Sequence, residues 1–332
     1  MQLRLQFQQN GIADEVAAIT AVVRPILEGT LYALKADVVA EVGGYDQVKL
    51  KMLPRLYRAG DGDCGLCFEY AVHDALNRRE PAVIERIHDA AHQFCNVPGR
   101  DPSSILFGLE KTGALNLIDT VKERLTDESR LLAGVRAQPA KLKRHIDSIA
   151  SAFRRRAERE TLPWSISGLW KADLFIGYTD SDRWVATTVK INSNQLEGAR
   201  GLRIGIVPVR GGADDRVRRD VQKNLIICPL PHDGSFMEVF YQGWGVIQQF
   251  IAADAQVPRE VFLPRQTDRQ VAHYLADRRE FPILDVIEAL LPLSQPELLR
   301  TQEQDAILVN RREAQYEIET GAVVAPMARN QG

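Results

Sequence analysis

Residues 170–192, WKADLFIGYTDSDRWVATTVKIN, decide the fold of this chain. Within them, Lys171–Gly177 and Arg183–Ile191 are rich in β-branched and aromatic residues, which are typical of strands. The polar run Tyr178–Asp182 between them predicts a tight turn. The stretch therefore predicts a β-hairpin, and the rest of the chain is read outward from it.

Each strand of this hairpin carries a charge at the same end of the predicted sheet. Asp173 lies near the start of the first strand, and Lys190 lies near the end of the second, in an otherwise apolar and hydroxylic run. Burying either group without a partner costs several kcal/mol. A divalent metal ion and a phosphate would supply the missing partners, so the hairpin predicts a site for both.

Composition places the chain in an ordinary class. Its 332 residues are 45% hydrophobic and 26% charged, as in a soluble globular protein. No apolar run approaches the roughly 20 residues that span a bilayer, and the start, MQLRLQFQQNG, lacks the apolar core of a signal peptide. Four cysteines are few for this length, which favours a reducing cytoplasm. The formal net charge of −2 excludes a uniformly basic nucleic-acid coat but leaves room for local basic patches.

The patterns predict an α/β protein with a small mixed sheet flanked by helices. We expect an N-terminal strand and helix region at 1–59, a core made of 60–79 plus 163–255, a helical insertion at 80–162, and a helical C-terminal region at 256–332. Further strands are predicted at 3–7, 202–209 and 224–228. Hydrophobic spacing predicts helices at 13–27, 64–78, 82–94, 103–118, 120–132, 139–159, 195–200, 236–253, 269–276, 283–291 and 296–313.

Three short motifs around the hairpin resemble the PD-(D/E)XK (restriction-endonuclease-like) nuclease superfamily. Its core has a helix bearing an acid, a strand bearing Asp, and a neighbouring strand that ends in acid-x-Lys. The run GLCFEYAV, which carries Glu69, is similar to that helix, and KAD, which ends at Asp173, stands where Pro-Asp often stands. TVK, which runs from Thr188 to Lys190, stands where the acid-x-Lys is expected. The resemblance covers about a third of the chain.

The resemblance implies a metal-dependent phosphodiesterase site. Asp173 would be the principal ligand of Mg²⁺, with Glu69 in support, and Lys190 would stabilise charge on the attacked phosphate. The sequence departs from the pattern because Thr188 is not an acid. Some members of the superfamily replace this acid with Ser or Thr and bring a carboxylate from the following helix. Glu197 is the candidate here, and Gln195 is a weaker one.

The same resemblance implies DNA as the partner. Two arginine clusters would then neutralise backbone phosphates, namely Arg154, Arg155 and Arg156, and Arg218 and Arg219. The implied function is a Mg²⁺-dependent DNA endonuclease, or a DNA-binding protein on a nuclease scaffold, in bacterial restriction or defence. A catalytically degenerate adaptor with a protein partner, or a homo-oligomer, stays open.

A second motif predicts a different enzyme class. GDGDC, which ends at Cys64, resembles the nucleophile segment of ovarian-tumour-type deubiquitinases and other papain-like peptidases. A cysteine at a helix N-terminus has a lowered pKa, and a general-base histidine, His232 or His273, would complete the pair. Gly65 departs from that family, which has a bulky apolar residue there. The alternative interpretation is a helix cap followed by a small buried cysteine.

A third constellation contains ligands for structural zinc. These are Cys64, Cys67, His88, His92 and Cys95. Four of them would satisfy a tetrahedral site if their helices brought them together. His88 and His92 share one helix face, so a solvated polar stripe is the alternative interpretation.

Overall fold

The structure is a computed structural model, and it divides into two compact units. It describes residues 11–58, 63–107, 121–132, 139–162, 169, 172–198, 201–210, 215–232, 235–260 and 262–294. One unit runs from 60 to 238, and the other combines 1–59 with 239–332. We call them the sheet unit and the helical unit and describe each by itself.

The sheet unit is built on one mixed sheet of eight described strands, which confirms the predicted α/β class. The order is β1-β4-β5-β6-β8-β7, with β2 beside both β5 and β3. The strands are β1 (Pro102–Leu106), β2 (Arg130–Leu131), β3 (Ala140–Lys141), β4 (Leu174–Tyr178), β5 (Arg183–Val189), β6 (Arg203–Val209), β7 (Arg218–Asp220) and β8 (Leu225–Pro231). The predicted hairpin is present as β4 and β5, and it lies between β1 and β6.

The sheet is mixed, with antiparallel pairs on one side of β5 and parallel pairs on the other, before β7 returns to antiparallel pairing with β8. β1, β4 and β5 are antiparallel neighbours, whereas β6 is parallel to β5, and β8 is parallel to β6. Parallel strands need a crossover, and the chain between β5 and β6 contains the short 3₁₀ helix η5 (Ser193–Gln195). The ends of β5 and β6 thus open on the same side, next to the start of β4.

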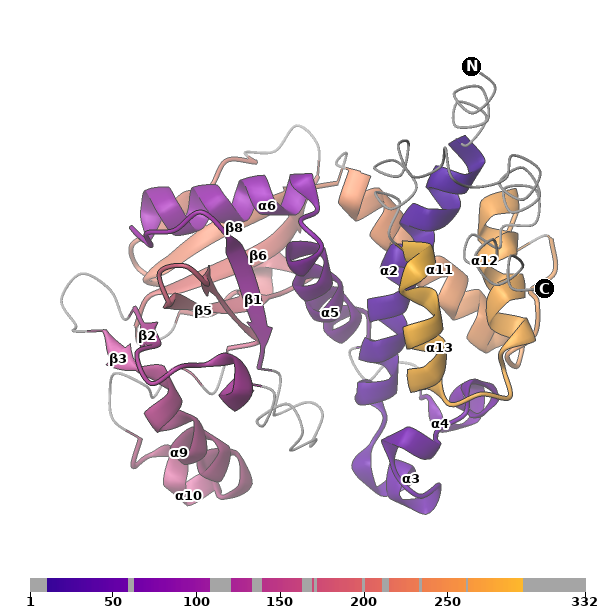
Figure 1. Cartoon of the computed structure of the whole chain (residues 1–332), viewed down its shortest axis with the longest axis horizontal. Helices are drawn as coiled ribbons and strands as arrows, with labels where there is room; N and C mark the ends of the chain where they lie inside the picture. The colour runs from indigo at the N-terminus through magenta and orange to yellow at the C-terminus, as the bar shows by residue number, and fades with distance from the viewer. Residues whose placement is uncertain are drawn as a thin grey trace, which may run out of the picture. The chain divides into compact units, whose positions relative to one another are not determined.

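Helices cover both faces of the sheet (Figure 1). Phe175, Trp184 and Ala186 point to the face covered by α9 (Leu142–Arg154), where they share one core with Leu142, Ile146 and Ile149. On the opposite face, α5 (Asp63–Asn77) packs against β1 and β5, and α6 (Pro81–His88) packs against β8 and β1. A π-helix, η3 (Asp89–Phe94), extends α6, and the one-turn α10 (Arg156–Arg159) follows α9.

The helical unit joins segments that are far apart in sequence. α2 (Gly11–Ala33) packs against α12 (Gln266–Asp277), α13 (Ile283–Leu290) and η6 (Pro292–Ser294). The amide of Leu50 donates to the carbonyl of Phe281 (3.0 Å), and that of Ile283 donates to Val48 (2.9 Å). α11 (Ser235–Ala252) enters this unit from the sheet unit, while α3 (Ala36–Glu41), η1 (Tyr45–Gln47), η2 (Leu50–Met52) and α4 (Leu53–Leu56) complete it.

One described helix is apolar and long enough to cross a membrane, contrary to the expectation from the sequence. It is Glu15–Ala33 within α2. However, 67% of its most apolar window is buried inside the structure, where Val23, Ile26 and Leu27 are fully covered. This is the burial that the core helix of a soluble protein shows.

Several predicted elements were wrong or fall outside the described residues. A helix was predicted at 103–118, but β1 occupies Pro102–Leu106, because Ile105 and Leu106 pair with the hairpin rather than with their own turn. Of the helix predicted at 120–132, one turn at 121–124 is present, and β2 follows it. β3 precedes α9, so the insertion is not wholly helical. The helix predicted at 195–200 is absent from its described part, because η5 ends at Gln195 and residues 196–198 are irregular. The strand at 3–7 and the helix at 296–313 lie outside the described residues.

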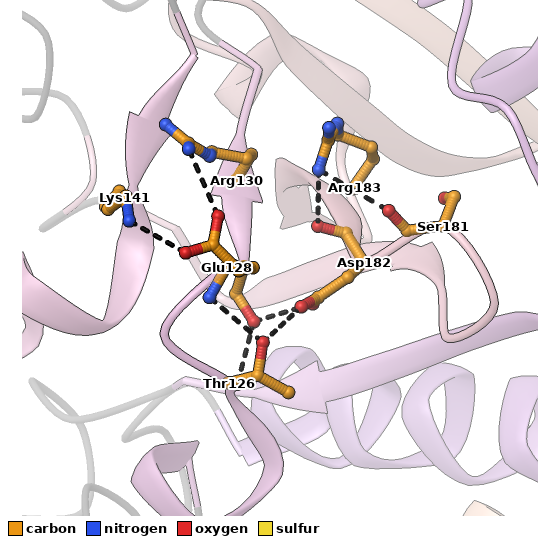
Figure 2. A network of polar contacts seen from close by, with 8 residues as sticks. Thr126, Glu128, Arg130, Lys141, Ser181, Asp182 and Arg183 are labelled. Atoms are coloured by element: carbon orange, nitrogen blue, oxygen red, sulfur yellow. Dashed lines mark hydrogen bonds and ion pairs between the residues drawn. The ribbon is translucent and has the colours of Figure 1, made fainter.

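A polar network fixes the turn of the hairpin to the β2 strand (Figure 2). The carboxylate of Asp182 accepts hydrogen bonds from the hydroxyls of Ser129 (2.6 Å) and Thr126 (2.5 Å) and from the indole of Trp184 (2.9 Å). Its carbonyl accepts the amide of Arg130 (3.0 Å). Asp182 has a left-handed backbone (φ 52°), which Asp and Asn tolerate best among residues with a side chain.

The pH dependence of stability should report this network. Burial raises the pKa of Asp182, but the bonds from Ser129, Thr126 and Trp184 outweigh it and hold the pKa below its ordinary value. Such a carboxylate stabilises the fold above a pH of about 4, and this contribution is lost as the pH falls through the lowered pKa. Asp182→Asn should therefore cost about 1–2 kcal/mol of unfolding free energy at pH 7, with a smaller difference at pH 3.

Urea unfolding at several pH values checks this expectation. Asp180→Asn is the matched control, because Asp180 lies in the same turn, is exposed, and accepts one bond from the amide of Arg100 (3.0 Å). A cost for Asp182→Asn that does not change between pH 3 and pH 7 would contradict the role given to its charge.

Candidate active site

Glu69 reaches the sheet from the buried face of α5. Its neighbours Phe68 and Tyr70 are fully buried, and Glu69 itself is 2% exposed. A carboxylate is rarely buried this deeply unless a cation or donors meet it. The helix therefore presents Glu69 to the sheet unit's interior instead of to solvent.

Asp173 stands immediately before β4 and is fixed by its own backbone. Its amide donates to the carbonyl of Thr187 (2.8 Å), and its carbonyl accepts the amide of Phe107 (2.8 Å). These two bonds continue the pairing of the hairpin and of β1 by one residue beyond the strands. Asp173 is 4% exposed, so its carboxylate also depends on partners within the protein.

Lys190 connects the two carboxylates. Its Nζ lies 2.9 Å from Oδ2 of Asp173 and 3.5 Å from Oε1 of Glu69. Its amide donates to the carbonyl of Ile206 (2.9 Å), which continues the parallel ladder past the end of β5. The structure thus brings Glu69, Asp173 and Lys190 together from one helix and two strand ends, although 121 positions separate Glu69 from Lys190.

Thr188 acts as a donor at this site. Its hydroxyl donates to Oδ2 of Asp173 (3.0 Å), and the amide of Val189 donates to the same oxygen (2.8 Å). Three consecutive residues at the end of β5 therefore bind one carboxylate oxygen. Thr188 therefore helps to hold the carboxylate of Asp173, the residue that precedes the neighbouring strand.

Arg203, at the start of β6, is a residue that the sequence interpretation missed. It is 3% exposed, and burial lowers the pKa of its guanidinium while the charges of Asp173 and Glu197 raise it. Glu197 is exposed in the connection between β5 and β6. The one signal in the sequence was an arginine opening an apolar strand, LRIGIVPV, and a solvated strand end produces the same pattern.

The charges of this group favour a cation. Three carboxylates (Glu69, Asp173 and Glu197) and two cations (Lys190 and Arg203) give a formal charge of −1. Mg²⁺ is usually held by one or two carboxylates, waters and substrate phosphates, so the carboxylates of Asp173 and Glu69 fit it in chemistry. Within the described ranges, no three or more His, Cys, Asp or Glu side chains gather closely enough to form a complete protein cage for a metal.

The arginines that were predicted to contact DNA lie on different elements of the sheet unit. Arg218 and Arg219 are exposed on β7, at the edge of the sheet beside β8. Arg155 is exposed after α9 and lies 3.2 Å from a carboxylate oxygen of Glu158. Of Arg154 and Arg156 the structure describes only the backbone, so their side chains lie outside the described part.

The cysteines and histidines of the alternative interpretation lie in different surroundings. Cys67, Cys95 and Cys228 are buried, and burial raises the pKa of the Cys95 and Cys228 thiols to about 12. Cys64 is half-buried at the start of α5. His232 follows β8 in the sheet unit, whereas His273 belongs to the helical unit.

The residues predicted as zinc ligands lie in separate surroundings. The rings of His88 and His92 stack in parallel, with centroids 5.2 Å apart, on the exposed face of α6 and η3. Cys95 is buried and lies outside that face. In the described part of the chain these residues form no metal-binding group.

Comparisons with protein-family models, curated proteins and solved structures return no match. The geometry of the described residues therefore carries the functional argument.

Thiol labelling should single out Cys64. In the native protein at pH 7.5, we expect one of the four thiols to react rapidly with a water-soluble disulfide reagent, because burial protects the other three. All four should react in denaturant, and Cys64→Ser should remove the rapid phase. Rapid reaction of two or more thiols in the folded protein would contradict the burial described.

Proposed function

We propose that this protein is a Mg²⁺-dependent phosphodiesterase acting on DNA, with its active site at the end of the β4–β5 hairpin. The observation that carries this proposal is the convergence of Glu69, Asp173 and Lys190 within 3.5 Å contacts. These are the acid, the acid and the lysine of the PD-(D/E)XK pattern. The resemblance rests on sequence motifs alone, and the fold brings the same three side chains together.

The charge balance supports a phosphodiester as the substrate. The five charged groups sum to −1, so a bound divalent cation changes the sum to +1. A single phosphodiester carries −1 and would neutralise it. Partly buried charges interact strongly because the local dielectric is low, so such a match discriminates between ligands.

Each residue then has a distinct task. Asp173 and Glu69 hold the cation, which when bound polarises the phosphoryl oxygens and activates a water molecule. Lys190, 26% exposed, is placed to contact a phosphate oxygen that enters from solvent. Thr188 and the amide of Val189 keep the Asp173 carboxylate in one orientation.

DNA outside the site would contact cationic side chains on the surface. Arg218 and Arg219 supply exposed guanidinium groups on β7, and Arg154, Arg155 and Arg156 are further candidates. A reducing cytoplasm fits four thiols that form no disulfide. A bacterial restriction or defence setting, with a protein partner or a second copy of the chain, is part of the proposal.

Cleavage assays test the site. Asp173→Asn and Lys190→Met should each abolish Mg²⁺-dependent DNA cleavage, a reduction of at least about 100-fold. The first removes the charge of the principal ligand of the cation, and the second removes the cation that faces the reacting phosphate. Cys64→Ser should leave the rate within about 2-fold. Circular dichroism and urea unfolding confirm that each variant is folded.

The outcome also separates the competing enzyme classes. Loss of activity in folded Cys64→Ser, with Lys190→Met still active, would replace the nuclease by a cysteine peptidase. DNA binding without cleavage in the wild type, over a range of DNA substrates and divalent cations, would favour the degenerate adaptor. The threonine at position 188 is the specific feature that makes this last outcome worth testing.

The salt dependence of DNA binding tests the β7 arginines. Arg218→Gln/Arg219→Gln should weaken binding uniformly across sequences and make the slope of log K against log salt shallower by about one unit for each phosphate that is no longer neutralised. The matched control is Arg259→Gln/Arg265→Gln, which removes two exposed arginines from the helical unit. Equal slopes for the wild type and the β7 variant would show that these arginines contact no phosphate and are simply solvated side chains on an edge strand.

A further inference from the structure

The buried guanidinium of Arg203 has no task in the proposed chemistry so far. Arginine is almost never fully buried unless it is paired, because desolvation of its charge is costly. Arg203 is 3% exposed and opens a strand whose next residues are apolar. A charge in such a place indicates specific anionic partners.

Strand register places Arg203 on the same face of the sheet as Thr188. Arg203 pairs with Ala186, and Gly205 pairs with Thr188, across the parallel β5–β6 ladder. Paired positions point to the same face of a sheet, so Arg203 shares the face of Thr188, whose hydroxyl binds Asp173. The charge of Arg203 interacts with both Asp173 and Glu197.

The chain on both sides of Glu197 is fixed against the sheet. Leu196 is 4% exposed and packs so closely on Gly205 that a Cβ there would lie 2.9 Å from its Cδ2. The carbonyl of Leu196 accepts the ammonium of Lys223 (3.0 Å), and a Cβ on Gly198 would lie 3.1 Å from the backbone of Lys223. Glu197 is therefore exposed to solvent, yet its backbone is held next to the start of β6.

We propose that Arg203 is a positioning residue that orients Glu197 toward Asp173, so that Glu197 serves as a further carboxylate once a cation is bound. Glu197 would then supply, from a different part of the chain, the carboxylate that is missing at position 188, where the residue is a threonine. A guanidinium suits this task because its planar set of donors can meet two carboxylates at once. This inference rests on the proposed function, since the carboxylates are taken to face a divalent cation.

The two cations of the site should then have opposite effects on metal binding. Lys190 contacts both Asp173 and Glu69, so its ammonium competes directly with a cation at those oxygens. Removing it should strengthen cation binding. If Arg203 positions Glu197, its removal should weaken cation binding. Simple Coulomb repulsion predicts the opposite, since removing a positive charge would strengthen the binding of a cation.

Mn²⁺ binding to the full chain, measured by electron paramagnetic resonance and calorimetry, tests this difference. We expect Lys190→Met to bind Mn²⁺ more tightly than the wild type, and Arg203→Met and Glu197→Gln each to bind about 10-fold more weakly. The double variant Arg203→Met/Glu197→Gln should be no weaker than either single variant. Arg203→Lys, which keeps the charge but not the planar fork, is the second variant if Arg203→Met does not fold, and it too should bind more weakly.

Tighter Mn²⁺ binding by Arg203→Met, or additive losses in the double variant, would overturn the inference. If the wild type binds no Mn²⁺, the proposed metal-dependent function fails, and the positioning role is then decided by urea unfolding of the same variants. A loss of stability in the double variant smaller than the sum of the two single losses supports the Arg203–Glu197 interaction. Additive losses overturn it.

Discussion

One carboxylate oxygen, Oδ2 of Asp173, is the contact on which the sheet unit's centre depends. It accepts the hydroxyl of Thr188, the amide of Val189 and the ammonium of Lys190, which are consecutive residues at the end of β5. Because Asp173 precedes β4, these bonds close one end of the hairpin. Lys190 then extends the same contact to Glu69 on α5, so a helix and two strands share a single set of charges.

The other end of the hairpin is closed in the same way by a different carboxylate. Asp182, in the turn, binds Ser129, Thr126 and Trp184 and so connects the hairpin to the segment before β2. A two-stranded hairpin alone is marginally stable in water. Fixed at both ends by carboxylates and extended by β1 and β6 at its sides, it becomes a rigid support for the charged group at its open end.

Sequence patterns predicted the elements whose signals are local. The β4–β5 hairpin, α2 and α5 follow from periodicity and turn residues, and Asp173 and Lys190 stood out because each is a lone charge in an apolar run. β1 was mistaken for a helix because SSIL is too short to show a period, and its strand conformation comes from pairing with β4.

The parts that could not be predicted depend on tertiary contacts. β7 is a charged strand of three residues, Arg218–Asp220, which exists only because β8 offers it a partner. The burial of Arg203 is likewise invisible in the sequence, since an arginine before an apolar strand is commonly solvated. Convergence of Glu69 on the hairpin needed the packing of α5 against β1 and β5. Periodicity did not predict that relation, whereas the resemblance of the short motifs did.

An excess of one negative charge is the feature in which this group of side chains differs from a balanced ion-pair network. Buried ion pairs are often replaced by apolar residues at no cost in stability, so a purely structural network has no need of excess charge. Here the two buried carboxylates, Glu69 and Asp173, are matched by Lys190 and Arg203, and the additional carboxylate is that of the exposed Glu197. Lys190 is still partly open to solvent. In the function proposed above, a divalent cation would compensate the additional negative charge, and the resulting positive charge would attract a phosphate.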